Sequence, residues 1–340
     1  MLLEVTNTME MQSVARTSFS KKYIPYLYQY GVYVIFIIMV IMFSFTNKHF
    51  FTVNNALMIL QQATPLGIAA IGMTFVLIIA GIDISVGQVM YLSAIMVAIT
   101  MEAMKPSDFL GSFWSYVIII LVAMLVGLAV GTLNGLVISR YKIVPFITTL
   151  ATMSIARGVG LISSNSKVYF VEKLSVITNG KIGNFPIIIL ILLFLVIIFD
   201  FVLRRTPYGR NLMAIGNDSV AAQKIGINVN KNVMIAYMIC GVMAGIAGML
   251  MAGQVANVAV YFADGSEFLV ISAAVLGGTS LFGGKGSVFP GALIGIILVT
   301  TIVNGMTMMN ASPYAYKIIR GAIIFLAVMV DSINYKGELR

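Results

Sequence analysis

The sequence is poor in charged side chains and contains one cysteine and one histidine. Only 10% of its 340 residues are charged, whereas 60% are hydrophobic and the mean hydropathy is +1.00. Soluble domains carry about 25% charged residues, and a soluble fold of this length has too little interior to bury so much apolar surface. Cys240 cannot form an intramolecular disulfide, and His49 alone cannot build a metal cluster or a proton relay. Lipid must therefore cover much of the chain, and no metal site or catalytic residue is expected.

Long apolar runs fill most of the sequence. A helix needs about 20 mostly apolar residues to cross a bilayer, and ten stretches approach this pattern. The third and the eighth are short and flanked by glycine, so either is expected to be broken or re-entrant. We predict an all-α polytopic membrane protein of about ten transmembrane helices over 26–331, between tails at 1–25 and 332–340. The expected spans are Tyr26–Phe45, Leu60–Ala80, Ser85–Met101, Phe113–Ser139, Pro145–Ser163, Phe185–Leu203, Val233–Val258, Phe268–Phe282, Ser287–Met306 and Ala315–Val330.

Basic residues are divided unequally between the two sides of this predicted bundle. With the N-terminus inside and alternating spans, thirteen lysines and arginines fall in inner segments and five in outer segments. Because basic residues collect in cytoplasmic loops, the split predicts cytoplasmic termini and an even number of spans. It also explains the net charge of +9 without a nucleic acid partner. The inner residues are Arg16, Lys21, Lys22, Arg140, Lys142, Arg204, Arg205, Arg210, Lys224, Lys231, Lys285, Lys336 and Arg340, and the outer ones are Lys48, Lys105, Lys167, Lys173 and Lys181.

The longest inner loop, 204–232, has a pattern typical of a short helix. Asn217 or Asp218 can cap its N-terminus, Val220–Lys224 would form its body, and Gly226 would end it. Ala221 lies on the same helical face as the residue four positions later, Ile225. The loop therefore contains either a solvated helix or a docking helix for a soluble partner.

The chain lacks an ATP-binding phosphate loop. The nearest segment to the pattern G-x-x-x-x-G-K-[ST] is Gly277–Gly286, but Thr279 stands where the first glycine is needed and Gly286 follows the lysine. Ion-coupled carriers normally need acids or a histidine within a span. The candidates here, Asp83, Asp200 and Asp331, all lie toward span ends. The sequence thus predicts no ATP hydrolysis by this chain and disfavours a proton- or sodium-coupled carrier.

Glycine occurs in two kinds of pattern. Two series at helical spacing favour close packing of helices. By contrast, the five glycines within Gly277–Gly286 will not form a stable helix, since each costs about 1 kcal/mol in a helix interior. Irregular backbone at membrane depth must be buried in protein or line an aqueous cavity, so this segment either packs or forms a path or gate. The two series are Gly127, Gly131 and Gly135, and Gly241, Gly245 and Gly248.

Two charged residues lie in or beside predicted spans. Arg157 is flanked by Gly158 and Gly160, and a cation there must face the bundle interior or a wet cavity, in a structural contact or in a path. Asp83 either caps the third span or belongs to the same path. The candidate path or gate residues are Asp83, Arg157, Gly277, Gly278, Thr279, Ser280, Gly283 and Gly284.

The same dipeptide, Asn-Gly, occurs near the end of two predicted spans, as Asn134-Gly135 in the fourth and as Asn304-Gly305 in the ninth. An offset of five spans reverses membrane orientation, as inverted repeats do in transporters. The repeated dipeptide therefore favours a weak inverted repeat.

Four stretches of the sequence stand out as motifs. They are Gly81–Gly87, GIDISVG; Val144–Met153, VPFITTLATM, with Arg157-Gly158; Thr206–Asn211, TPYGRN, with Ala214–Asn217 and Ala221-Ala222; and Val275–Gly286, VLGGTSLFGGKG. These stretches resemble the permease subunits of bacterial ABC importers for ribose, xylose, arabinose, galactose and related sugars. The resemblance runs from about Leu60 to Asp331, and together the four stretches are specific to that family.

The resemblance implies the ABC importer permease fold and a set of partners. It implies a second permease copy, identical or related, a cytoplasmic ABC ATPase that holds the ATP and Mg²⁺, and a periplasmic or extracellular sugar-binding protein. The chain itself would need no cofactor and would reside in the bacterial inner membrane. The loop that begins at Thr206 matches the segment expected to contact the ATPase. Its candidate residues are Arg210, Asn217, Asp218, Ala221, Ala222, Ile225 and Gly226.

Other functions remain open at this point. Relatives that carry the autoinducer-2 signal share the resemblance, although the GIDISVG form is more similar to the sugar permeases. A secondary transporter would lack an ATPase partner. A polytopic membrane enzyme would need a polar cluster of histidine, cysteine or paired carboxylates, which the sequence does not contain.

We predict that a cysteine placed at position 338, in a chain whose Cys240 has been replaced, is protected from an impermeant thiol reagent in sealed right-side-out cells. The reason is the excess of basic residues in the inner segments. A cysteine placed within 164–184 should react under the same conditions and is the control. Labelling at 338 would contradict the predicted topology.

Overall fold

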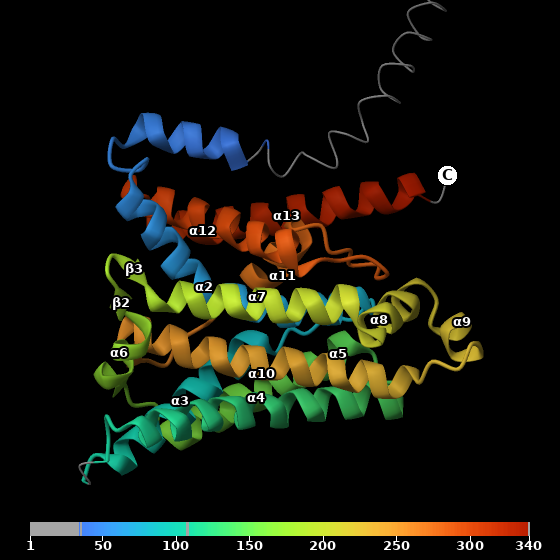
Figure 1. Cartoon of the computed structure of the whole chain (residues 1–340), viewed down its shortest axis with the longest axis horizontal. Helices are drawn as coiled ribbons and strands as arrows, with labels where there is room; N and C mark the ends of the chain where they lie inside the picture. The colour runs from blue at the N-terminus through green and yellow to red at the C-terminus, as the bar shows by residue number, and fades with distance from the viewer. Residues whose placement is uncertain (1–33, 35, 107–108, 339–340) are drawn as a thin grey trace, which may run out of the picture.

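The computed structural model describes residues 34, 36–106 and 109–338, which form a bundle of helices aligned along one direction (Figure 1). Seven helices in this part of the chain are long and apolar enough to cross a membrane. An all-α polytopic membrane protein is therefore confirmed. The seven are α2 (Val53–Ile78), α3 (Val86–Met104), α4 (Phe113–Tyr141), α5 (Pro145–Ser164), α7 (Ile187–Arg205), α10 (Val229–Val255) and the run Val288–Met308, in which a π-helical turn, η2 (Val288–Ala292), continues into α12 (Leu293–Met308).

The other three predicted spans correspond to helices outside this group of seven, so the count differs from ten. Two are the shorter apolar helices Phe36–Thr46 and α11 (Ser266–Leu276). At 1.5 Å per residue α11 is about 16 Å long, roughly half of a bilayer core. The third is α13 (Pro313–Glu338), which contains several charged residues and continues beyond the predicted end of the last span.

Two details of the predicted spans are resolved by the helix ends. The eighth span is short, as expected, because α11 starts after Gly265 and stops at Gly277. The third is not broken: α3 is one continuous helix of 19 residues. Flanking glycines thus bound the short helix α11, whereas they do not interrupt α3. The predicted N-terminal tail and the first residues of the first span lie outside the described residues.

The core of the bundle is built by α10, which packs against α2, α3 and α4. Both glycine series lie at these contacts, as the close-packing interpretation predicted. A Cβ on Gly127 would lie 2.0 Å from the carbonyl oxygen of Gly241, and one on Gly245 would lie 2.1 Å from that of Ala123. Gly248 faces the backbone of Met90 on α3 in the same way. Side chains cannot be accommodated there, so the backbones of α4, α10 and α3 approach one another directly.

Short strands and turns close one end of the bundle. Strand β1 (Tyr169–Phe170) pairs antiparallel with β4 (Asn257–Val258), and β2 (Lys181–Ile182) pairs with β3 (Phe185–Pro186). Between them lie the 3₁₀ turn η1 (Glu172–Leu174) and the short helix α6 (Ser175–Thr178). The predicted outer loop 164–184 is thus a packed structure.

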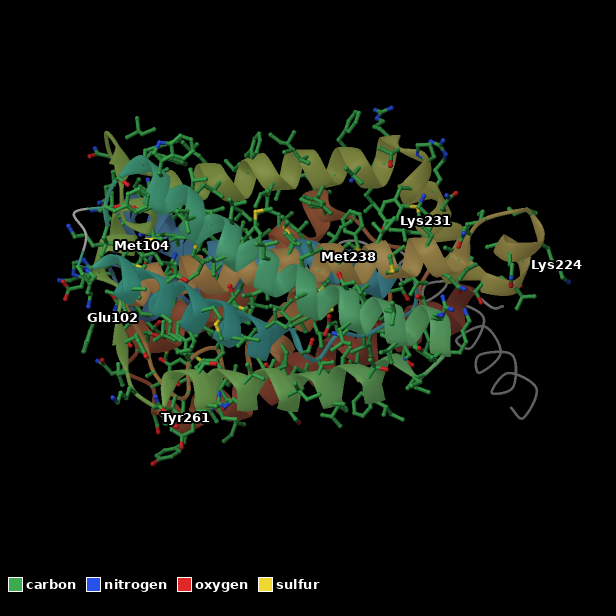
Figure 2. The ribbon with its side chains drawn as sticks, turned by 90° about the horizontal axis from the view of Figure 1, so that it is seen from below. Glu102, Met104, Lys224, Lys231, Met238 and Tyr261 are labelled. Carbon is green, nitrogen blue, oxygen red and sulfur yellow. The ribbon has the colours of Figure 1, made fainter. Side chains whose placement is uncertain are left out.

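Two short helices occupy the opposite end. They are α8 (Pro207–Asn217) and α9 (Ser219–Lys224), and α13 ends on the same side (Figure 1). Figure 2 shows Lys224 and Lys231 at this end, Glu102 and Met104 at the other, and Met238 between them. The predicted inner and outer loops therefore lie at opposite ends of the molecule.

The two asparagines of the suspected inverted repeat are both buried. Asn134 and Asn304 are both inside the bundle, at 0% and 4% exposure. Gly135 packs on Met234 of α10, whereas Gly305 packs on the ring of Phe43. The helices that carry them, α4 and α12, run in opposite directions along the bundle (Figure 1). The repeat itself stays a prediction.

We predict that Gly127→Ala lowers the stability of the protein in detergent by about 1–3 kcal/mol, the usual cost of overpacking. The added Cβ would overlap the backbone of α10. Thermal unfolding monitored by circular dichroism measures the effect. Gly158→Ala is the matched control, because a Cβ there meets nothing within 4 Å. Equal melting curves for the two variants would contradict the direct contact of α4 with α10.

Candidate functional site

The predicted inner-loop helix is present as α9, and Asp218 is its cap. The Asp218 carboxylate accepts hydrogen bonds from the backbone N–H groups of Val220 and Ala221, at 2.8 and 2.9 Å. Gly226 follows with φ of +87°, in the left-handed region that favours glycine at a helix end. Asn217, the other candidate cap, is instead the last residue of α8.

Three apolar side chains of α9 are presented to solvent. Val220 is 60% exposed, Ile225 is 76% exposed and Ala221 is also exposed; we call these three residues the α9 patch. Ala222 does not belong to it, because it is buried at 2% exposure within this chain. Its predicted part in the ATPase contact stays a prediction, but its side chain packs within this chain. Arg210 on α8, another candidate contact residue, is exposed.

Helix α8 is held against the bundle by Tyr208. Its ring stacks on Phe75 of α2, with centroids 6.2 Å apart, and its hydroxyl donates to the carbonyl of Asn232 at 3.3 Å. Burial raises the pKa of the Tyr208 hydroxyl above its ordinary value, so it remains a donor throughout the physiological range. Tyr208 thus ties the inner loop to α2 and to the start of α10.

The glycine-rich segment Gly277–Gly286 lies at the end of α8. The N–H of Gly284 donates to the carbonyl of Ile78, the last residue of α2, at 2.8 Å. A Cβ on Gly284 would lie 2.1 Å from Oδ1 of Asn217, and one on Gly216 would lie 1.8 Å from the Ile78 carbonyl oxygen. Sequence analysis left open whether this segment packs or forms a path, and its observed contacts are close packing at the α8 end of the bundle.

Helix α13 holds two other residues of the segment through its Asp331 side chain. The N–H of Leu281 donates to the Asp331 carboxylate at 2.8 Å, and the Ser280 hydroxyl lies 3.4 Å from the same oxygen. Thr279 is buried at 1% exposure. Gly278 alone among the six candidate residues of the segment is exposed, with φ of +88°.

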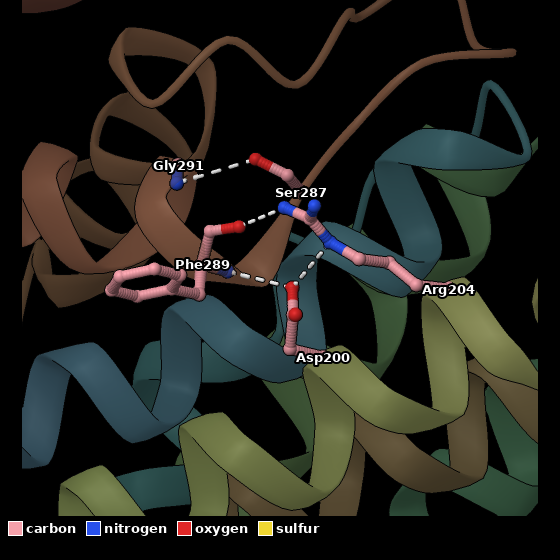
Figure 3. A network of polar contacts seen from close by, with 5 residues as sticks. All are labelled: Asp200, Arg204, Ser287, Phe289 and Gly291. Atoms are coloured by element: carbon pink, nitrogen blue, oxygen red, sulfur yellow. Dashed lines mark hydrogen bonds and ion pairs between the residues drawn. The ribbon is translucent and has the colours of Figure 1, made fainter.

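The break before α12 is held by the end of α7. Figure 3 shows Asp200 accepting from the N–H of Phe289 and from Nε of Arg204, both at 3.0 Å, while Arg204 also donates to the Phe289 carbonyl. Ser287 accepts from the N–H of Gly291 at 3.2 Å and closes the η2 turn. Asp200 therefore has a structural task, satisfying backbone groups that an interrupted helix leaves open.

Arg157 belongs to a different group of side chains, which we call the Arg157 group. Its guanidinium donates to Oε1 of Gln88 at 3.2 Å and lies over the rings of Tyr91 and Tyr261, 5.0 and 5.9 Å from their centroids. Nε2 of Gln88 reaches Oδ1 of Asp264 at 3.5 Å. The group joins α3, α5 and the connection between α10 and α11.

The side chains of the Arg157 group become more exposed from the interior of the bundle to its surface. Tyr91 and Gln88 are buried, Arg157 is half-buried, and Asp264 and Tyr261 are exposed, the latter at 79%. Figure 2 shows Tyr261 pointing away from the bundle, near the end that carries Glu102. A cation at this position cannot face lipid without a large cost, so this face must meet water or protein.

Asp83 lies in the turn between α2 and α3 and is only 2% exposed. Its carboxylate accepts from the N–H and the hydroxyl of Ser85, at 2.9 and 2.6 Å, and Nδ2 of Asn134 donates to that hydroxyl at 3.0 Å. The predicted cap is therefore corrected: Asp83 holds the turn that precedes α3, whereas Ser85 occupies the N-cap position.

Sequence analysis missed several residues of these groups. Gln88 and Tyr91 lie in a run that is typical of an ordinary buried span, and Tyr261 and Asp264 fall in the predicted connection between the seventh and eighth spans. Arg204 was identified only as a basic loop residue. Within the described residues, no group of three or more histidine, cysteine, aspartate or glutamate side chains could hold a metal ion.

We predict that Asp200→Ala lowers the stability by about 1–3 kcal/mol, because the Phe289 N–H loses its acceptor. Glu102→Ala is the control: Glu102 forms an exposed pair with Lys105 three positions later, and such pairs contribute about 0–1 kcal/mol. Thermal unfolding in detergent compares the two. A larger loss for Glu102→Ala would contradict the anchoring role of Asp200.

Comparison with known proteins supports the resemblance over nearly the whole chain. Residues 55–328 match the model of a family described as "Branched-chain amino acid transport system / permease component". The ribose import permease protein RbsC of Haemophilus influenzae is 32% identical over 318 residues, covering 92% of this chain and 95% of that protein. The galactose/methyl galactoside import permease protein MglC of Escherichia coli is 31% identical over 327 residues, or 93% and 97%. The D-allose transport system permease protein AlsC of Escherichia coli is 31% identical over 311 residues, or 91% and 93%. No solved structure matches the chain. The chain belongs to this family of transport permeases.

Proposed function

We propose that this chain is the membrane-spanning subunit of an ATP-driven importer that carries a pentose or hexose into the bacterial cytoplasm. The observation that carries the proposal is its nearly end-to-end similarity to permeases whose names state ribose, galactose, methyl galactoside or allose import. The family model is named for branched-chain amino acids. The aligned relatives favour a sugar, because they match over more than 90% of both chains.

The ATPase partner would contact the α9 patch. Val220, Ala221 and Ile225 form an exposed apolar surface on a short capped helix at the extremity of the molecule (Figure 1). Exposed apolar residues in such a position are typical of a protein interface, and the chain has no phosphate loop with which to bind ATP. The partner would supply the two nucleotide sites with their Mg²⁺. Arg210, Asn217, Asp218 and Gly226 would position the patch.

The sugar would pass the Arg157 group. A guanidinium, an amide and a carboxylate can all form hydrogen bonds with hydroxyl groups, and Tyr261 offers an exposed ring to the apolar face of a sugar. Because Arg157 cannot face lipid, a second copy of the permease would cover this side and complete the route. The external binding protein would deliver the sugar at the end closed by α6 and the short strands.

We predict that Ile225→Asp weakens binding of the ATPase about five- to a hundredfold, because a charge in the centre of an apolar contact typically costs 1–3 kcal/mol or more. The ATPase is identified by mass spectrometry in the complex purified from the native cell. Its binding to the variant is measured by pull-down, and ATP-driven uptake of ribose, galactose and allose is measured in proteoliposomes supplied with the external sugar-binding protein from the same cell. Uptake of at least one sugar by the wild-type complex is expected, with loss in the variant.

The matched control is Ile182→Asp, the same substitution at an isoleucine of β2 that is 65% exposed at the opposite end. It should bind the ATPase normally. A wild-type complex that transports none of the three sugars would contradict the proposed cargo. Normal ATPase binding by Ile225→Asp would contradict the assignment of the α9 patch.

A further inference from the structure

Three segments from distant parts of the sequence meet at the end of α8 with no side chain between them. They are Ile78 at the end of α2, Gly216 near the end of α8, and Gly284 in the glycine-rich segment. Gly284 donates its N–H to the Ile78 carbonyl at 2.8 Å, and a Cβ on Gly216 would lie 1.8 Å from that carbonyl oxygen and 2.3 Å from the Gly284 nitrogen. We call this contact the glycine joint.

Neighbouring residues make the joint tighter. A Cβ on Gly283 would lie 2.8 Å from the Gly216 carbonyl oxygen and 3.0 Å from Ala80. On Gly284, the three nearest atoms to an added Cβ all belong to Asn217. Backbone in direct contact has no rotamers through which to absorb a displacement, and close-packed interiors transmit strain. A shift of α8 must therefore move the end of α2 or the glycine segment.

On one side of the joint lies the α9 patch. Gly216 is two residues from Asp218, whose carboxylate caps α9. Another attachment of α8 also leads to α2, through the stacking of Tyr208 on Phe75. The Tyr208 hydroxyl and Gly209 hold α8 to α10 and α7 as well. A displacement of α9 that moves α8 therefore reaches the C-terminal half of α2.

On the other side lie the turn after α2 and the Arg157 group. Ile78 is followed by the turn that Asp83 holds, and the turn leads into α3. Helix α3 carries Gln88 and Tyr91, two of the residues that touch Arg157. The path from the joint to Arg157 therefore runs along one short stretch of chain.

The glycine segment is itself fixed to the rest of the bundle. Asp331 of α13 accepts from Leu281 within the segment, and Asp200 of α7 accepts from Phe289, three residues after its end. Gly277 and Gly291 lie in backbone contact, with a Cβ on Gly277 only 2.3 Å from the Gly291 carbonyl oxygen. The segment thus presents α2 and α8 with a firm support rather than a loose loop.

We propose that the glycine joint is the point at which movement of the inner loop enters the membrane bundle and is passed through α2 and α3 to the Arg157 group. The Gly277–Gly286 segment then acts as the support against which α8 moves, and not as the lining of the sugar path. This inference rests on the proposed function. Gly216 and Gly284 are positioning residues for transport and do not contact the sugar.

The test separates the transmission of movement through the glycine joint from the binding of the ATPase. Wild type and Gly216→Ala are reconstituted in proteoliposomes with the ATPase that copurifies with the wild-type chain and with the external sugar-binding protein from the same cell, and ribose, galactose and allose are the probes. The variant should retain its ATPase, because the α9 patch is unchanged. The amount of sugar imported per ATP hydrolysed should fall about fivefold or more, the size of a typical coupling between sites. Gly321→Ala, where a Cβ meets nothing within 4 Å, should keep the wild-type ratio.

A second pair of variants keeps the proposal open to refutation if Gly216→Ala does not accumulate in the membrane. Gly284→Ala should also lower the ratio, because its Cβ would strike the Asn217 side chain. Asn217→Ala removes that side chain and should restore the ratio in the double variant. Gly284 has φ of +75°, and Gly183→Ala controls for that strain, since Gly183 has φ of +63° and open space around it.

The outcomes distinguish this proposal from the proposed function. A reduced ratio with normal ATPase binding, restored by Asn217→Ala, supports the joint. An unchanged ratio in both Gly216→Ala and Gly284→Ala overturns it while leaving the importer assignment intact. A parallel loss of ATPase binding and transport, without rescue, also overturns it, because the joint would then only hold the inner loop together. A wild-type chain without any ATPase would overturn both proposals.

Discussion

Every interruption of a helix in a membrane bundle leaves backbone N–H and carbonyl groups that lipid cannot satisfy, and this constraint organises the structure. The turn after α2 is closed by Asp83 and Ser85. The carbonyl at the end of α2 is used by Gly284, and the break before α12 is held by Asp200. The protein can therefore contain irregular backbone among its helices because each irregular segment is bonded to another part of the same chain.

Glycine allows these bonds to form in two different ways. Along α4 and α10 it removes the side chains that would keep two regular helices apart, as at Gly127 and Gly241. In the segment Gly277–Gly286 it permits left-handed backbone, as at Gly283 and Gly284, which lets the chain turn sharply beside α8. The first use stabilises a helix pair, and the second brings the inner loop into backbone contact with a transmembrane helix.

The two regions to which we assign functions lie at different places along the bundle and differ in chemistry. At one end, the α9 patch is small, apolar and exposed, as suits contact with a soluble protein. Farther toward the other end, the Arg157 group combines a cation, an amide, a carboxylate and two aromatic rings. A transport subunit needs both kinds of surface, because energy is received at one place and used at another. The chain belongs to a family of transport permeases, and this is why we interpret the two surfaces as serving different steps of transport.

The sequence by itself determined the class of the protein, most of its helices and the short helix of the inner loop. Hydropathy, glycine spacing and helix-end residues act over a few neighbouring positions, so the end of this helix at Gly226 and the two glycine series were identified correctly. The sequence offered Asn217 or Asp218 as its cap, and the structure shows that Asp218 is the cap. Only the tertiary structure decided that Ala222 is buried, that Asp83 holds a turn, and that α11 is short while α3 is not. It alone joined Arg157 to Gln88 and Gly216 to Gly284 and Ile78. These contacts join residues from about 70 to more than 130 positions apart, and no local pattern specifies which distant backbone will approach a glycine.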